Sequence, residues 1–121
     1  MRQLSYKIDG RSVLDGIDMH IKSGETYSIM GPSGVGKSTL IKCIGGLIRP
    51  TSGQLLIDGI DIAQLDEERL NPIRRRIGMV FQSAALFDSL SVYENVAFGL
   101  RRHTRLTEKE ISEIVSARLR W

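Results

Sequence analysis

The sequence predicts an α/β fold built around a phosphate-binding loop, and two observations support this prediction. Residues 31–39 read GPSGVGKST and match the pattern G-x-x-x-x-G-K-[ST] at every fixed position. This segment stands between a short apolar run, residues 26–30, and a run with helical spacing, residues 38–47. A strand, a glycine-rich loop and a helix in this order favour the binding of a polyphosphate.

The position of the loop at the start of a helix explains the chemistry expected of it. Backbone N–H groups in a first helical turn have no partner within the helix, and the positive end of the helix dipole faces the loop. Lys37 is expected to reach the terminal phosphates and Ser38 to place its hydroxyl on Mg²⁺. A glycine-rich turn that binds nothing is the alternative. The residues predicted to bind phosphate are Gly31, Pro32, Ser33, Gly34, Val35, Gly36, Lys37, Ser38 and Thr39.

Composition indicates a soluble globular chain of one domain, since 41% of its 121 residues are hydrophobic and 26% are charged. The net charge of +3 is small and aromatic residues make up 6%, so we expect no nucleic-acid partner. The basic clusters at residues 74–76 and 101–102 are predicted to be solvated. Cys43 is the single cysteine and is expected to pack rather than react. No apolar run approaches the ~20 residues that span a bilayer, which predicts a cytoplasmic protein.

The N-terminal segments are predicted as follows. Residues 1–21 alternate loosely between apolar and polar, with Asp9-Gly10 as a turn signal, and this predicts a β-hairpin. Residues 25–30 are predicted to form the strand that leads into the loop. The helix after the loop has an apolar face that includes Leu40 and Ile44.

The middle of the chain predicts shorter elements. Residues 54–57 form an expected short strand that is closed by the turn signal Asp58-Gly59. Residues 66–70 have the composition of a polar surface helix, which Pro72 is expected to interrupt.

The C-terminal third predicts a strand and then helices. Residues 77–81 are an apolar run typical of a buried parallel strand, and Gln82 stands at its end. The pattern turns helical from Ser91, and Thr107-x-x-Glu110 has the spacing of a capping box ahead of a last helix that is expected to run to Trp121.

These motifs in their order resemble the N-terminal part of an ATP-binding-cassette (ABC) transporter ATPase, and the likeness covers essentially every residue. The carriers are the hairpin, GPSGVGKST, SGQLLIDGIDI, RRRIGMVFQSAALF and LSVYENVAFGL. The resemblance implies that residues 31–39 bind ATP and that Gln82 is the Q-loop glutamine, which senses Mg²⁺ and the attacking water. Without its neighbours Gln82 would be only a polar residue ending a strand. The implied catalytic residues are Lys37 and Gln82, and the implied metal ligands are Ser38 and Gln82.

Within that family, residues 81–111 are most similar to the ATPase subunit of Mla-type phospholipid transporters. The similarity rests on few residues, chiefly 83–87 and 101–104, which an unrelated importer could share. It implies a membrane permease, a homodimer of ATPase subunits and a lipid-carrying substrate-binding protein as partners. It also implies a peripheral location on the inner face of the cell membrane.

The surface around residues 82–93 is predicted to seat a cytoplasmic helix of the permease. Its apolar and aromatic side chains, Leu86, Phe87, Leu90 and Tyr93, belong to a segment predicted to be a loop. Packing of Leu86 and Leu90 beneath the following helices is the alternative.

Several family features are absent from these 121 residues. Ile8 stands where many members place an adenine-stacking aromatic, so it is our candidate for apolar contact with the base, while Tyr6 is expected in the core. The sequence contains no LSGGQ, no apolar run ending in Asp-Glu and no later switch histidine. Asp66-Glu67 is rejected as the catalytic pair, because acids are common in a first helical turn. The resemblance implies an ATPase at full length, and these residues alone are expected to bind without hydrolysis.

The predicted organisation is a partial nucleotide-binding domain, with the ATP-binding core and β-subdomain in residues 1–90 and the start of a helical subdomain in residues 91–121. A P-loop kinase or GTPase is the alternative, although the guanine-recognition motif NKxD is absent. A non-catalytic, ATP-responsive interaction module is a third possibility.

Overall fold

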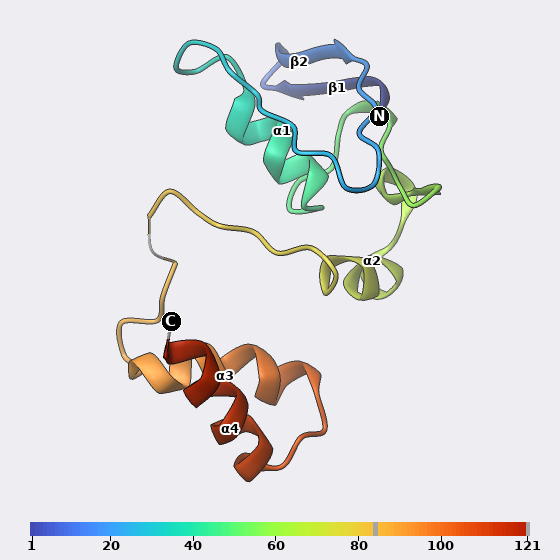
Figure 1. Ribbon diagram of the computed structural model, residues 1–121. Helices are drawn as coiled ribbons and strands as arrows, with labels where there is room; N and C mark the ends of the chain where they lie inside the picture. Colours follow the sequence, from blue (N-terminus) through green and yellow to red (C-terminus); the bar gives the residue numbers. More distant parts are fainter. Residues whose placement is uncertain (84, 121) are drawn as a thin grey trace. The chain divides into compact units, whose positions relative to one another are not determined.

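A computed structural model describes residues 1–83 and 85–120 and divides the chain into two compact units, Met1–Met79 and Val80–Trp121 (Figure 1). The first unit combines short strands with two α-helices, and the second contains two helices. The α/β class is therefore confirmed. The functional boundary at residue 90 stays a prediction. In the part of the chain that is described, no helix is long and apolar enough to cross a bilayer.

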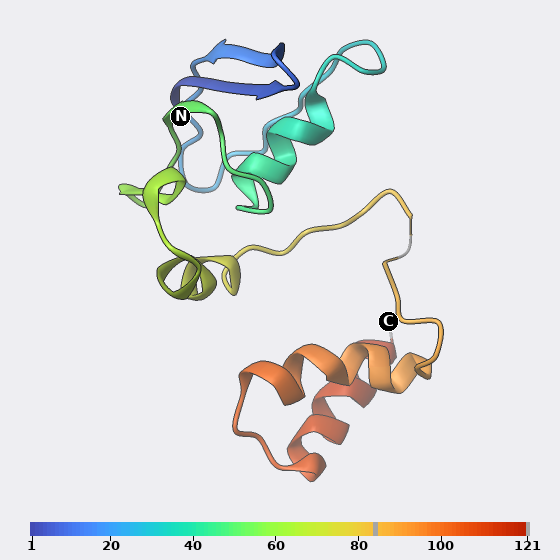
Figure 2. The ribbon, with the colours of Figure 1, turned by 180° about the vertical axis from the view of Figure 1, so that it is seen from behind.

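The predicted N-terminal hairpin is confirmed. Strands β1 (Arg2–Ile8) and β2 (Arg11–Ile17) pair antiparallel. Asp9 and Gly10 both have positive φ, 48° and 76°, which is the requirement of the two-residue turn that matches strand twist. Strand β3 (Ser52–Gln54) adds to the other edge of β1 and gives a sheet in the order β2-β1-β3, whose first two strands are clear in Figure 2.

A second, smaller hairpin follows the first sheet. Strands β4 (Leu56–Ile57) and β5 (Ile60–Asp61) pair antiparallel around Asp58 and Gly59, whose φ values of 49° and 80° repeat the geometry of the first turn. A short 3₁₀ segment, η1 (Ile62–Gln64), leads from this hairpin toward the second helix.

Helix α2 (Glu67–Arg74) begins as the sequence predicts, but Pro72 does not interrupt it. The Asp66 carboxylate accepts a hydrogen bond from the backbone N–H of Arg69 at 2.8 Å, which makes it a helix cap. Pro72 lies inside the helix and removes one backbone donor. The helix ends two residues later, so the predicted interruption is wrong and only the last turn is affected.

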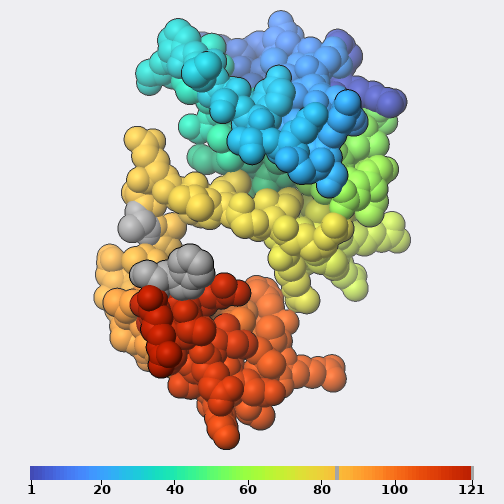
Figure 3. Space-filling view, viewed as in Figure 1, coloured from blue at the N-terminus to red at the C-terminus, as the bar shows by residue number. Residues whose placement is uncertain are grey.

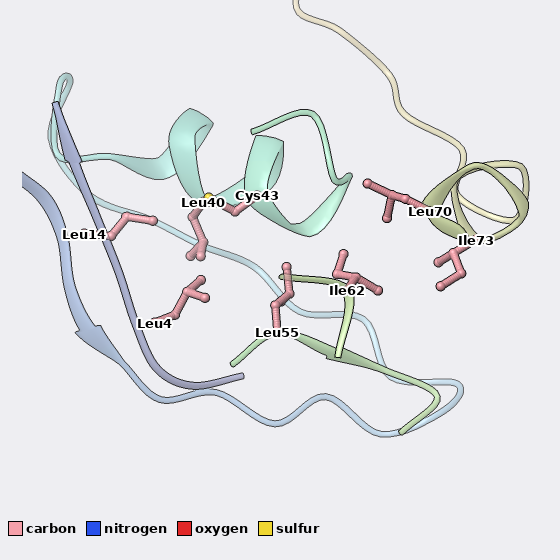
Figure 4. Packing of buried hydrophobic residues seen from close by; sticks show 8 residues of the cluster. All are labelled: Leu4, Leu14, Leu40, Cys43, Leu55, Ile62, Leu70 and Ile73. Atoms are coloured by element: carbon pink, nitrogen blue, oxygen red, sulfur yellow. The ribbon is translucent and has the colours of Figure 1, made fainter. Parts of the chain in front are cut away.

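The core of the first unit lies between the sheet and helix α1 (Lys37–Ile44) and continues through Ile62 of η1 to Leu70 and Ile73 of α2, as Figure 4 shows. Cys43 is fully buried there, and burial raises the pKa of its thiol, so it packs as a small apolar residue as expected. The buried members are Leu4, Leu14, Leu40, Cys43, Leu55, Ile62, Leu70 and Ile73.

Arg74 departs from the solvated basic face that the sequence predicts. Its guanidinium donates to the carbonyl of Gly46 at 2.6 Å and to the carboxylate of Glu67 at 2.5 Å. Arg74 therefore ties α2 to the turn that follows α1. Arg76, two residues further on in the same basic cluster, pairs with Asp58 at 2.6 Å on the exposed surface, as a solvated residue does.

Two predicted strands are not formed. Residues 25–30 and 77–81 have no strand partner in the described residues, and Met30 and Val80 are 89% and 99% exposed. A strand requires a neighbour that accepts and donates its ladder hydrogen bonds. The apolar composition of these two segments indicates that they favour burial, but it does not show whether a neighbouring strand is present to pair with them. The prediction of two strands is wrong for this reason.

The second unit contains α3 (Val92–His103) and α4 (Glu108–Leu119). Ala97, Ile111 and Val115 form its buried cluster. Both helices were predicted. Helix α4 ends at Leu119, short of the predicted end at Trp121, which lies outside the described residues.

Both helices of the second unit begin with a complete capping box. Ser91 accepts from the N–H of Glu94 while the Glu94 carboxylate accepts from the N–H of Ser91 at 2.8 Å. Thr107 and Glu110 repeat the arrangement at 2.7 Å, which confirms the box read from the sequence. The backbone and side-chain hydrogen bonds that each glutamate accepts hold its pKa below the ordinary value of 4.5.

These capping boxes predict an acid-sensitive pair of helices. Because each folded-state pKa is lowered, the stabilisation is present above pH 4.5 and is lost as the pH falls through the folded pKa. Far-UV circular dichroism during acid titration should show a steeper loss of helix in the wild type than in the variant Glu94→Gln with Glu110→Gln. Glu113→Gln, an exposed position of α4, should behave as the wild type. Identical acid profiles in all three proteins would contradict this account.

Candidate functional site

The first turn of α1 is open to an anion. Gly36 precedes the helix with a left-handed φ of 99°, and no side chain caps the helix or places an acid in its first turn. The other α-helices in the described residues each have a side-chain cap. The backbone N–H groups of Lys37, Ser38 and Thr39 are therefore left for an external acceptor, and the dipole favours a negative one.

The two side chains expected to act on phosphate and metal lie on this turn. The Lys37 ammonium donates to the carbonyls of Gly31 and Pro32 at 2.7 and 2.6 Å, so it folds back onto the loop. The Ser38 side chain is exposed, and its hydroxyl makes no hydrogen bond within the described residues. A lysine ammonium, open N–H groups and a hydroxyl oxygen fit a polyphosphate that carries a hard cation.

The loop before α1 is exposed and is anchored at its last glycine. Figure 3 shows this segment, in cyan, at the surface of its unit. A Cβ atom on Gly36 would lie 2.7 Å from the Val13 carbonyl oxygen and 3.1 Å from a methyl of Leu14, both on β2. A Cβ on Gly34 would meet nothing within 4 Å, although its φ is also positive. Gly36 therefore permits the start of α1 to lie directly against β2.

The other predicted site residues lie elsewhere. Ile8 is 47% exposed at the end of β1, and Tyr6 packs against the core of the first unit, as expected. Gln82 lies in the second unit, exposed at a bend. Contact of Ile8 with a base and the action of Gln82 on Mg²⁺ and water stay predictions.

The segment predicted to meet a permease is partly exposed and partly packed. Leu86 is 65% exposed, and Phe87 is 50% exposed with its ring centroid 4.7 Å from that of Phe98. Leu90 is half-buried. Tyr93 lies within α3 and packs against the cluster of the second unit, so its place in a loop surface is wrong. The helical pattern that starts at Ser91 already includes Tyr93.

Asn95 is a residue that the sequence interpretation did not single out. Its side-chain amide bonds the backbone of the segment that precedes α3. Asn95 stands four residues after the capping Ser91, at a position where an apolar residue often packs against the residue before the cap. A polar residue at this position is the signal by which the sequence could have identified Asn95. Asparagine at such a position competes for backbone hydrogen bonds.

The anchoring of the loop predicts a difference between two glycine substitutions. Gly34→Ala should cost about 1–2 kcal/mol, the strain of a left-handed alanine. Gly36→Ala should cost more, because the same strain is joined by the clash with the Val13 carbonyl. Urea unfolding of both variants measures the difference. Equal midpoints for the two would show that the contact between the loop and β2 does not matter.

Comparison with known proteins gives the family. A family model described as ABC transporter matches residues 14–120. Over 119 residues the chain is 44% identical to the intermembrane phospholipid transport system ATP-binding protein MlaF of Haemophilus influenzae and 41% identical to that of Escherichia coli K12. It is 40% identical over 119 residues to the probable ribonucleotide transport ATP-binding protein mkl of Mycobacterium leprae. Each match covers 98% of this chain but only 45%, 44% and 34% of the relative, so the chain spans less than half of their length.

Solved structures agree with this assignment. A post-hydrolysis dimer of the ATP-binding cassette MJ0796 bound to ADP and Pi matches with a TM-score of 0.85 and 37% identity, over 96% of this chain and 53% of that one. CbiO1 from Clostridium perfringens, part of the transporter complex cbiONQ, matches with a TM-score of 0.81 and 40% identity, over 98% and 47%. The two-unit chain with its uncapped, glycine-anchored α1 therefore belongs to the ABC transporter family.

Proposed function

We propose that this chain is the nucleotide-binding part of an ABC transporter ATPase that binds Mg-ATP through residues 31–39 and couples its hydrolysis to phospholipid movement. The open first turn of α1, with Lys37 and Ser38 on it, is the observation that carries the proposal. Family membership sets aside the kinase and GTPase alternatives. A full-length protein that binds ATP without hydrolysing it would instead be the interaction module.

Each residue has a proposed role. ATP supplies the phosphoryl group whose transfer to water releases free energy. The N–H groups at the start of α1 hold the phosphates, and the Lys37 ammonium neutralises their charge. Phosphate oxygens then compete with the carbonyls of Gly31 and Pro32 for the three ammonium donors. Ser38 and Gln82 would ligate Mg²⁺, and Gln82 would also orient the attacking water.

Phospholipid is the proposed substrate because the MlaF relatives match at 44% and 41% identity. A ribonucleotide is the second candidate, since the mkl relatives match at 40–42%. The proposed partners are a membrane permease, a second copy of the ATPase subunit and a lipid-carrying substrate-binding protein. The MJ0796 cassette, which was solved as a dimer, supports the second copy. The proposed location is the inner face of the cell membrane.

Nucleotide binding should depend on Lys37 and much less on Lys42, an exposed lysine on the same helix. Lys37→Ala should weaken Mg-ATP binding by roughly 10- to 100-fold, the loss of charge-assisted hydrogen bonds. Ser38→Ala should lower the affinity for ATP in the presence of Mg²⁺ more than it lowers the affinity for ATP without metal, because the serine hydroxyl is expected to bind the metal. Isothermal titration calorimetry measures both. Equal affinity of the Lys37 and Lys42 alanine variants would remove Lys37 from the site.

Docking on a permease should depend on Phe87. The probe is the purified permease subunit of the source organism's MlaF-type system, bound to the full-length protein in detergent. Phe87→Ala should weaken that binding while Mg-ATP affinity stays unchanged, because Phe87 is exposed and is not one of the residues proposed to bind ATP or Mg²⁺. Leu119→Ala is the matched control, since Leu119 is 46% exposed in the same unit. Unchanged binding in the Phe87 variant would overturn the docking role, and loss of folding would indicate a core residue.

A further inference from the structure

The amide of Asn95 holds the backbone of Phe87 on both sides. Its Oδ1 accepts a hydrogen bond from the Phe87 N–H at 2.8 Å, and its Nδ2 donates to the Phe87 carbonyl at 3.1 Å. An N–H can only donate, so the atom facing it must be the amide oxygen, and this fixes the orientation of the side chain. A single side chain thus makes hydrogen bonds to both backbone groups of Phe87, as the backbone of a residue on a paired strand does.

The same amide also closes the turn that leads into α3. Nδ2 lies 3.1 Å from the Leu90 carbonyl and 3.0 Å from the Ser91 carbonyl. The turn has its own hydrogen bond, from the Leu90 N–H to the Phe87 carbonyl at 3.0 Å. The Asn95 side chain therefore holds residues 87–90 to the first turn of α3, beside the capping box that already holds Ser91.

This attachment determines where an aromatic surface is displayed. The centroids of the Phe87 and Phe98 rings lie 4.7 Å apart, and the ring planes meet at 48°, a tilted arrangement of the kind that aromatic pairs favour. Both side chains are about half exposed, at 50% and 47%. Phe98 is fixed by α3, whereas Phe87 belongs to an irregular segment. The pair therefore exists only if the Phe87 backbone is held against α3.

We propose that Asn95 is a positioning residue for the docking of the permease: it holds Phe87 beside Phe98 so that the two rings present one preformed surface to a cytoplasmic helix of that subunit. The inference rests on the proposed function, which supplies the partner. Preformed side chains bind with less loss of conformational freedom. Asn95 acts through Phe87.

The role can be separated from general stability because Asn95 does not belong to the core of its unit. The buried cluster consists of Ala97, Ile111 and Val115. Alanine is also a better helix former than asparagine. Asn95→Ala should therefore leave α3 and α4 folded while it releases Phe87.

The test measures hydrogen exchange at the Phe87 amide and permease binding in the same full-length protein. In Asn95→Ala the amide should exchange about fivefold faster and permease binding should weaken about fivefold, the effect of one typical hydrogen bond. Mg-ATP affinity should not change. Asn71→Ala is the control. Among residues 1–83 and 85–120 the Asn71 amide oxygen accepts a hydrogen bond only from Arg74, at 3.3 Å on α2, so this substitution should alter none of these quantities.

A second variant, Asn95→Asp, keeps the test decisive if Asn95→Ala fails to fold. Asn95→Asp keeps the size and the acceptor for the Phe87 N–H but turns an oxygen toward the carbonyls of Phe87, Leu90 and Ser91. It should weaken permease binding at least as much as alanine does.

The outcomes separate this inference from the proposed function. If Phe87→Ala weakens permease binding and neither Asn95 variant does, the positioning role is overturned and the docking function stands. If Phe87→Ala has no effect, docking through Phe87 fails and this inference fails with it. An equal loss of permease and Mg-ATP binding in the Asn95 variants would indicate a general structural defect and would also overturn the positioning role.

Discussion

The close approach of Gly36 to the backbone of β2 is the constraint on which the first unit depends. Because no side chain stands between Gly36 and the Val13 carbonyl, α1 begins directly against the hairpin. Leu40 and Cys43 then enter the core on the inner face of the helix. Gly36 also has no side chain that could cap α1, so the first N–H groups of the helix stay open. The absence of a side chain at Gly36 therefore explains both the packing of α1 and the opening of the site.

Features encoded within a few residues were predictable from the sequence. Each hairpin turn requires two residues that tolerate positive φ, and Asp-Gly pairs mark both. The caps of α2, α3 and α4 follow from a polar residue whose side chain reaches a nearby N–H. The phosphate loop is of the same kind, because its pattern specifies glycines and a lysine at fixed spacing.

Features that depend on distant partners were not predictable in the same way. The apolar runs at residues 25–30 and 77–81 show the composition of strands, but strand formation is decided by a neighbour. Arg74 reads as part of a basic cluster, and only the fold brings the Gly46 carbonyl to it. Asn95 is similar, since its importance comes from the path of residues 87–91 rather than from its own pattern.

Binding of Mg-ATP at the open first turn of α1 can be tested by observing the loop amides while nucleotide is added. Nuclear magnetic resonance of the ¹⁵N-labelled chain resolves the backbone N–H groups of Gly34, Gly36 and Ser38 individually. We expect these resonances to shift in a saturable manner with Mg-ATP, since the three amides lie where the open first turn of α1 meets the loop. Loop resonances that remain unchanged at saturating nucleotide, while other parts of the chain respond, would contradict it.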